Sequence, residues 1–187
     1  MIATDMETAT LDDLMAVDYK AELINGRLVR MMATGRLPNR IAGRIYSSLL
    51  AHADRSRLGE AYTDNMGFAV KRLHSGRESF APDAAYFTGA FPRNEMRFID
   101  GAPTFAVEVR SEGDYRAYSD DEIAAKRRDY FEAGTTVVWD VDTKSQCINS
   151  YCALSQYTKT VFKMGGIAHA EPAVPGWEIA VAHIFQL

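Results

Sequence analysis

The sequence predicts an α/β fold in which helices flank a central mixed β-sheet. One observation is that strand and helix patterns alternate through the middle of the chain, with an alternating segment at 103–109, a helical segment at 119–134 and a β-branched segment at 136–141. Another is the composition, because 47% hydrophobic and 25% charged residues are ordinary values for a globular protein. Alternation of this kind is typical of helices packed on a sheet.

A single domain spanning residues 1–187 is expected. The length of 187 residues is that of one domain, and a chain this long buries about 70% of its unfolded surface, so it needs neither disulfides nor a structural metal to fold. No internal repeat, low-complexity tract or Pro/Gly/Ser-rich linker divides the chain.

The sequence argues against membrane, secreted and zinc-finger proteins. No apolar run approaches the ~18 residues that span a bilayer, and the acidic N-terminus lacks the basic lead of a secretory signal. Cys147 and Cys152 have no C-x-x-C spacing and are interpreted as free thiols of a reducing compartment. We therefore expect a cytoplasmic protein with no membrane partner.

The N-terminal part predicts a short helix followed by a hairpin. The helix covers 10–17, where Thr10 caps it and Asp13 completes a capping box. Asn25-Gly26 lies between extended segments and predicts a tight hairpin turn, because both residues tolerate positive φ.

A longer helix is predicted next. Pro38 occupies its first turn, and three residues recur at four-residue spacing on a face toward the core: Ile41, Ile45 and Leu49. Arg40 and Arg44 lie together on another face. Residues 60–73 then predict short strands interrupted by turn formers.

The middle of the chain contains the strands that carry candidate site residues. Asp83 opens a short strand at 84–87, and a polar loop covers 88–101. The strand at 103–109 alternates: Phe105, Val107 and Val109 on one face, and Thr104, Ala106 and Glu108 on the other.

A helix, a strand and a hairpin complete the prediction. The helix begins with a capping-box sequence, Ser119 to Glu122, and ends near Gly134. Four of its residues form a mostly apolar inward stripe: Ile123, Arg127, Tyr130 and Phe131. The C-terminal region is expected to form a hairpin-like unit containing Tyr151, Tyr157 and Val161.

The charge distribution leaves two interpretations open. The net charge is −4, yet the segment from Leu23 to Ala53 has no acidic residue and contains five arginines: Arg27, Arg30, Arg36, Arg40 and Arg44. Such a segment can contact a polyanion locally, or it can simply be a solvated face.

Glu108 is the most informative candidate site residue. It interrupts the run Phe-Ala-Val-Glu-Val, where a buried carboxylate is costly unless it is paired, hydrogen-bonded or bound to a metal. The alternative is an edge strand on which Glu108 is merely solvated.

Asp83 and Lys126 give weaker signals. Pro82-Asp83 is also an ordinary turn dipeptide. Lys126 follows Glu122 by four residues, as in a surface helix pair, yet it also borders the buried stripe.

Several motifs together resemble the Uma2 family of restriction-endonuclease-like proteins, within the PD-(D/E)XK nuclease superfamily. They are Ala21-Glu-Leu-Ile-Asn-Gly26, Pro82-Asp83, Phe105-Ala-Val-Glu-Val-Arg-Ser111, and Lys126-x-x-x-Tyr130-x-x-x-Gly134 followed by Trp139-Asp-Val-Asp142. Four motifs in the same order form a specific pattern, running from about Thr10 to Asp142.

The resemblance implies a restriction-endonuclease-like core and a metal-dependent phosphodiesterase site. Asp83 and Glu108 are then the metal ligands, Glu22 is an additional acidic contributor, and Lys126 positions or activates the attacking water. Oxygen ligands suit Mg²⁺ or Mn²⁺. The bound cation makes water more acidic and neutralises charge on the phosphate oxygens.

Two departures from the pattern are visible. Arg110 stands where the E-x-K pattern has lysine, and arginine stays protonated, so it can stabilise charge but cannot act as a base. Asn39-Arg40 stands where many family members carry histidine near the start of the first long helix. The carboxylates and Lys126 are unaffected.

Other site chemistries find little support in the sequence. The four histidines lack metal-ligand spacing, and neither a G-x-S-x-G motif nor a glycine-rich phosphate loop occurs. Asp140 and Asp142 end a strand in a sequence that more often makes a turn.

The leading hypothesis is therefore a Mg²⁺-dependent endodeoxyribonuclease acting on DNA. Arg40 and Arg44 are candidate phosphate contacts. The alternatives are a non-catalytic nucleic-acid-binding or interaction module that retains the nuclease fold, and a metal-dependent phosphoesterase for a smaller substrate. A homodimer is expected, because two symmetry-related sites cut both strands most simply.

Overall fold

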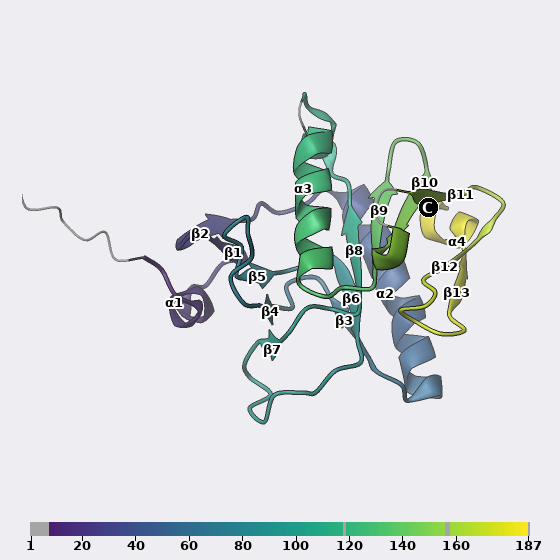
Figure 1. The fold of residues 1–187 in the computed structure, drawn as a ribbon. Helices are drawn as coiled ribbons and strands as arrows, with labels where there is room; N and C mark the ends of the chain where they lie inside the picture. Colours follow the sequence, from purple (N-terminus) through teal and green to yellow (C-terminus); the bar gives the residue numbers. More distant parts are fainter. Residues whose placement is uncertain (1–7, 118, 156–157, 187) are drawn as a thin grey trace, which may run out of the picture.

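The computed structural model describes residues 8–117, 119–155 and 158–186, and Figure 1 shows their arrangement. Its centre is a six-stranded sheet with the order β11-β10-β9-β8-β6-β3. The strands are β3 (Glu60–Thr63), β6 (Ala84–Phe87), β8 (Phe105–Val109), β9 (Val137–Asp142), β10 (Cys147–Cys152) and β11 (Lys159–Lys163). Neighbours are antiparallel except β8 and β9, which are parallel, so the predicted mixed sheet is confirmed.

Helices cover both faces of this sheet. In Figure 1, α3 (Ser119–Glu132) lies in front of β8, and α2 (Arg36–Ser56) lies behind the sheet. The predicted stripe of α2 packs on Trp139 and its neighbours, together with α4 (Val181–Phe185). Tyr130 of α3 packs with Phe80 and Ala106 on the other face. The sheet therefore separates two apolar layers.

Strand β8 lies inside the sheet, between β6 and β9. Phe105, Val107 and Val109 face the α2 layer, whereas Ala106 packs in the α3 layer. Glu108 follows the same alternation and lies on the α3 side. The edge-strand interpretation of Glu108 is wrong, because β8 is paired on both sides.

The N-terminal hairpin is confirmed. Strands β1 (Ala21–Ile24) and β2 (Arg27–Arg30) are joined by Asn25-Gly26, with φ of +52° and +65°. The amide of Leu23 donates to Ser79 Oγ at 2.8 Å, and the amide of Glu78 donates to the Leu23 carbonyl at 2.8 Å. These bonds fix β1 beside the segment that leads into β6.

Smaller elements complete the described chain. They are α1 (Leu11–Ala16), β4 (Phe68–Ala69), β5 (Ser79–Phe80), β7 (Ile99–Asp100), β12 (Ile167–His169), β13 (Glu178–Ala180) and the 3-10 helices Glu112–Tyr115 and Ala153–Ser155. Thr10 and Asp13 form the predicted capping box of α1. No helix in the described part of the chain is both long and apolar enough to cross a bilayer.

The structure refines two expectations, one for the start of α3 and one for the C-terminal hairpin. Helix α3 already includes Ser119, and the Ser119 hydroxyl donates to the Gly113 carbonyl at 3.4 Å, so Ser119 does not act as the predicted cap. Tyr151 in β10 and Val161 in β11 belong to an antiparallel pair, as expected of the C-terminal hairpin. Tyr157 lies outside the described residues.

Candidate active site

A row of polar residues crosses the sheet on the face that α3 covers. The register pairs Glu108 with Asp140 and Asp140 with Asn149. It also pairs Ala84 with Val107, and continuing that register by one residue sets Asp83 opposite Glu108. The Asp83 amide donates to the Val107 carbonyl at 3.0 Å, which extends the ladder to that point. Asp83 and Glu108 are therefore cross-strand neighbours on one face.

Glu108 is held by two residues of α3. Tyr130 Oη donates to Glu108 Oε1 at 2.6 Å, and Lys126 Nζ lies 2.9 Å from Oε1 and 3.0 Å from Oε2. Lys126 and Tyr130 are one helical turn apart, so both side chains project from the same face of α3.

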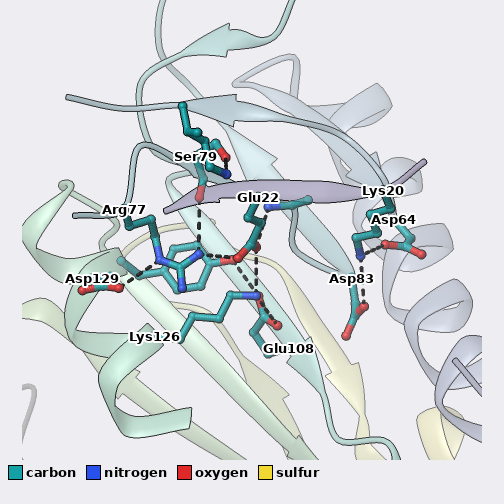
Figure 2. A network of polar contacts seen from close by, with 12 residues as sticks. Lys20, Glu22, Asp64, Arg77, Ser79, Asp83, Glu108, Lys126 and Asp129 are labelled. Atoms are coloured by element: carbon teal, nitrogen blue, oxygen red, sulfur yellow. Dashed lines mark hydrogen bonds and ion pairs between the residues drawn. The ribbon is translucent and has the colours of Figure 1, made fainter. Parts of the chain in front are cut away.

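Lys126 connects Glu108 to Glu22. Its Nζ lies 3.1 Å from Glu22 Oε1, so one ammonium bridges carboxylates from β8 and β1 (Figure 2). Burial would lower the pKa of Lys126, but the charges of Glu108 and Glu22 outweigh it and raise the pKa above its ordinary value. The ammonium therefore keeps its charge at neutral pH.

Glu22 is almost fully buried, with 3% of its side chain exposed. It is paired with Arg77 and accepts a hydrogen bond from the Ala81 amide at 3.1 Å. Burial would raise the pKa of Glu22, yet Lys126 and Arg77 lower it overall. Arg77 Nε also lies 2.9 Å from Asp129 Oδ2, which links the hairpin to α3.

Asp83 lies on the other side of Glu108 (Figure 2). Its Oδ2 accepts a hydrogen bond from the Val109 amide at 2.7 Å. Burial and the neighbouring Glu108 charge raise the pKa of Asp83 to about 7. Lys20 Nζ lies 4.0 Å from Asp83 Oδ1 and pairs with Asp64. A second ammonium thus lies beside the carboxylate pair.

The structure brings Glu22, Glu108 and Lys126 together and places Asp83 next to Glu108. It does not bring Arg40 and Arg44 to these carboxylates, because α2 lies on the opposite face of the sheet. Arg44 donates to the carbonyls of His183 and Ile184 at 3.0 and 3.3 Å. A role of Arg40 and Arg44 in binding phosphate stays a prediction.

Arg110 does not reach Glu108. Its Nε and Nη2 donate to the two carboxylate oxygens of Asp140 at 2.7 Å each, and its Nη1 lies 2.9 Å from Asp120. Bidentate pairing of this kind fixes the guanidinium. Lys126 is thus the cation that contacts Glu108.

The carboxylates of this site can be compared with the ligands that a bound metal ion requires. Within residues 8–117, 119–155 and 158–186, no group of three or more His, Cys, Asp or Glu side chains is arranged to hold a metal ion. Mg²⁺ keeps several waters, however, and is usually bound by one or two carboxylates together with substrate phosphates. Asp83 and Glu108 fit a cation that takes its other ligands from water and phosphate.

Sequence reasoning missed several members of this network. The contact of Tyr130 with Glu108 has a sequence signal, since Tyr130 follows Lys126 by four residues on a helix. Arg77, Lys20 and Asp64 have no such signal, because they meet their partners only through the docking of β1 and β3.

Comparison with known proteins agrees with this architecture. The model of the Uma2 family, described as "Putative restriction endonuclease", matches residues 8–182. One similar solved structure is a protein described as a "putative nuclease belonging to DUF820" from Anabaena variabilis, with a TM-score of 0.73. It is 18% identical, and the match covers 94% of this chain and 97% of that chain, so the likeness shows the fold. No curated protein matches the chain.

The family match covers nearly the whole described chain and includes every residue of the network around Lys126. The chain belongs to the Uma2 family.

Proposed function

We propose that this protein is a divalent-metal-dependent endodeoxyribonuclease that hydrolyses phosphodiester bonds of DNA. The observation that carries the proposal is the cross-strand pair Asp83–Glu108 beside the charged amine of Lys126. Family membership supports the same conclusion, because the family carries the description "Putative restriction endonuclease".

Asp83 and Glu108 would hold Mg²⁺ or Mn²⁺, which supplies a more acidic water and offsets charge on the phosphate oxygens. The Val109 amide fixes one oxygen of Asp83, and Tyr130 fixes Glu108. Both carboxylates are thus oriented by the fold before any ligand binds.

Lys126 would act as a charged group. Because its pKa is raised, it does not serve as a general base at neutral pH. The ammonium instead orients the attacking water or stabilises the charge that builds on the phosphate. Glu22 acts through Lys126 and is a positioning residue.

A plasmid assay tests the proposal. Supercoiled DNA is expected to be nicked with Mg²⁺ or Mn²⁺, and a chelator is expected to stop the reaction. Asp83→Ala and Lys126→Met should each lower the nicking rate by at least about a hundredfold, the scale of removing one charged transition-state contact. Asp121→Ala, which removes an exposed acid of α3, serves as the control.

Folding of each variant is checked by circular dichroism. The nuclease proposal is refuted if the protein cleaves DNA neither with Mg²⁺ nor with Mn²⁺. It is also refuted if the Asp83→Ala variant is as active as the parent protein.

One observation favours a second function, a non-catalytic nucleic-acid-binding module. Lys126 already forms ion pairs with two of the site carboxylates, and no three-ligand metal cluster occurs in the described residues. This function predicts salt-sensitive DNA binding without nicking in either cation.

A further inference from the structure

Beyond Asp140, the α3-covered face of the sheet opens into a hollow. The hollow has a volume of about 580 Å³ and is bounded by α3 and by strands β9, β10 and β11. We call it the α3 hollow and define it by six of its lining residues: Arg110, Arg127, Asn149, Tyr151, Lys159 and Lys163. A volume of this size lies within the ~300–1,000 Å³ of small-ligand sites, so it admits a nucleotide but not a duplex.

The acidic residues of the α3 hollow are already occupied. Arg110 pairs with Asp140 and with Asp120. Asp142 accepts a hydrogen bond from Tyr115 Oη at 2.7 Å and two more from the backbone amides of the following turn. The hollow is thus lined by four cations and three carboxylates, and two of these carboxylates are paired with Arg110.

Three cations remain available there. Across the described ranges, Arg127, Lys159 and Lys163 form no ion pair with any carboxylate. Lys159 and Lys163 are exposed on β11, and Arg127 is half-buried on α3. Cations on both sides of the hollow favour a ligand that carries negative charge.

Arg127 and Tyr151 form a stacking platform. Arg127 Cζ lies over the Tyr151 ring, 3.7 Å from its centroid, and both side chains line the hollow. Aromatic rings and guanidinium planes are the groups on which unpaired bases stack. Asn149 also lines the hollow; its Nδ2 donates to the Asp140 carbonyl at 3.5 Å, so its amide oxygen is the group that can accept from a base edge.

The α3 hollow adjoins the candidate active site. Asp140, on its floor, is the register partner of Glu108 on the next strand. Tyr151 lies on β10, two strands from Glu108 on β8, and neighbouring strands are roughly 4.8 Å apart, so a nucleotide in the hollow is about 10 Å from a phosphate at Glu108.

We propose that the α3 hollow binds one unpaired nucleotide of a single-stranded DNA segment, on the β10 and β11 side of the phosphate that is cleaved. The base stacks on the Arg127–Tyr151 pair, and the backbone phosphates contact Lys159 and Lys163. The inference rests on the proposed function for the place of cleavage, and it assigns a substrate class: DNA with an unpaired or flipped-out nucleotide.

Binding in the presence of a chelator tests this inference separately from catalysis. Fluorescence anisotropy compares a labelled eight-nucleotide oligothymidylate with a blunt hairpin duplex of eight base pairs. The single strand should bind more tightly. Arg127→Met, which removes the planar cation, should weaken single-strand binding about tenfold or more. Arg128→Met, at the neighbouring exposed position outside the hollow, should change it less than twofold.

Two further measurements locate the ligand. Lys163→Met should reduce the magnitude of the slope of log K against log salt by about 0.7, the value per phosphate contact for single strands, whereas exposed Lys71→Met should leave it unchanged. Bound oligonucleotide should slow alkylation of Cys147, which lines the hollow, relative to Cys152, as resolved by mass spectrometry.

Wild-type single-strand affinity in both Arg127→Met and Lys163→Met, or tighter binding of the duplex, would overturn the inference. Either result leaves the plasmid assay for the proposed function untouched. Single-strand binding that depends on Arg127 without any nicking supports this site and refutes the nuclease proposal instead.

Discussion

Among individual residues, the Asp83 carboxyl departs far from its behaviour in water. Its pKa is raised to about 7 by burial and by the Glu108 charge, compared with about 3.9 for an unfolded aspartate. Between these two values the native state binds more protons than the unfolded state. The free energy of unfolding therefore falls as the pH rises from about 4 to 7, and the loss is complete above pH 7.

Asp83→Asn removes this titration. We expect the variant to gain stability relative to the parent between pH 5 and pH 8, by on the order of 2 kcal/mol after allowing for partial exposure. Urea denaturation at the two pH values, with chelator present, measures the difference. Asp121→Asn, at an exposed position of α3, is the control substitution. If the difference in unfolding free energy between Asp83→Asn and the parent is the same at pH 5 and pH 8, the prediction is contradicted.

The site shows which residues a sequence can reveal. Glu108 and Lys126 could be identified because a charge within an apolar strand or beside an inward helical stripe breaks a local pattern. Arg77 lies 55 residues from Glu22 and gives no local pattern, so only the folded arrangement reveals their pairing. Partners across such distances depend on docking rather than on spacing.

At the level of elements, the position of β1 depends on a side chain outside the central sheet. The Ser79 hydroxyl accepts the Leu23 amide, and this contact is buried. Ser79→Ala leaves that amide without a partner, which should cost about 1–3 kcal/mol of stability. It should also loosen β1, which carries Glu22.

Amide hydrogen exchange at Leu23 checks the effect of Ser79→Ala. Exchange at Leu23 should accelerate more than exchange at Val107 in β8, whereas Ser155→Ala, at an exposed position, should change neither. Equal acceleration at both amides would mean that the whole molecule, and not β1, has been weakened.

Most helices and strands follow from local chemistry. The stripe of α2, the Asn25-Gly26 turn and the alternation of β8 each predicted their element correctly. Helix α3 begins at Ser119 as predicted, although the Ser119 hydroxyl bonds to the Gly113 carbonyl in the preceding loop. Strand order is absent from local patterns: β8 could be recognised as a strand but not as an interior one.

For the whole molecule, we expect a homodimer, because two symmetry-related sites are the simplest way to cut two strands. Light scattering coupled to size exclusion should give twice the mass of one chain across a tenfold range of protein concentration. A mass of one chain throughout that range would refute this expectation. The alternating pattern predicted helices on the two faces of a central sheet, but it gave no information on any surface between subunits.

The bridging of Glu22, Glu108 and Asp129 by Lys126 and Arg77 has an evolutionary consequence. Three acids and two bases share this partly buried network, so losing Lys126 leaves three carboxylates with a single cation, Arg77. Relatives that lack the lysine should therefore also have exchanged one of the acids, and these five positions should be inherited as a linked set.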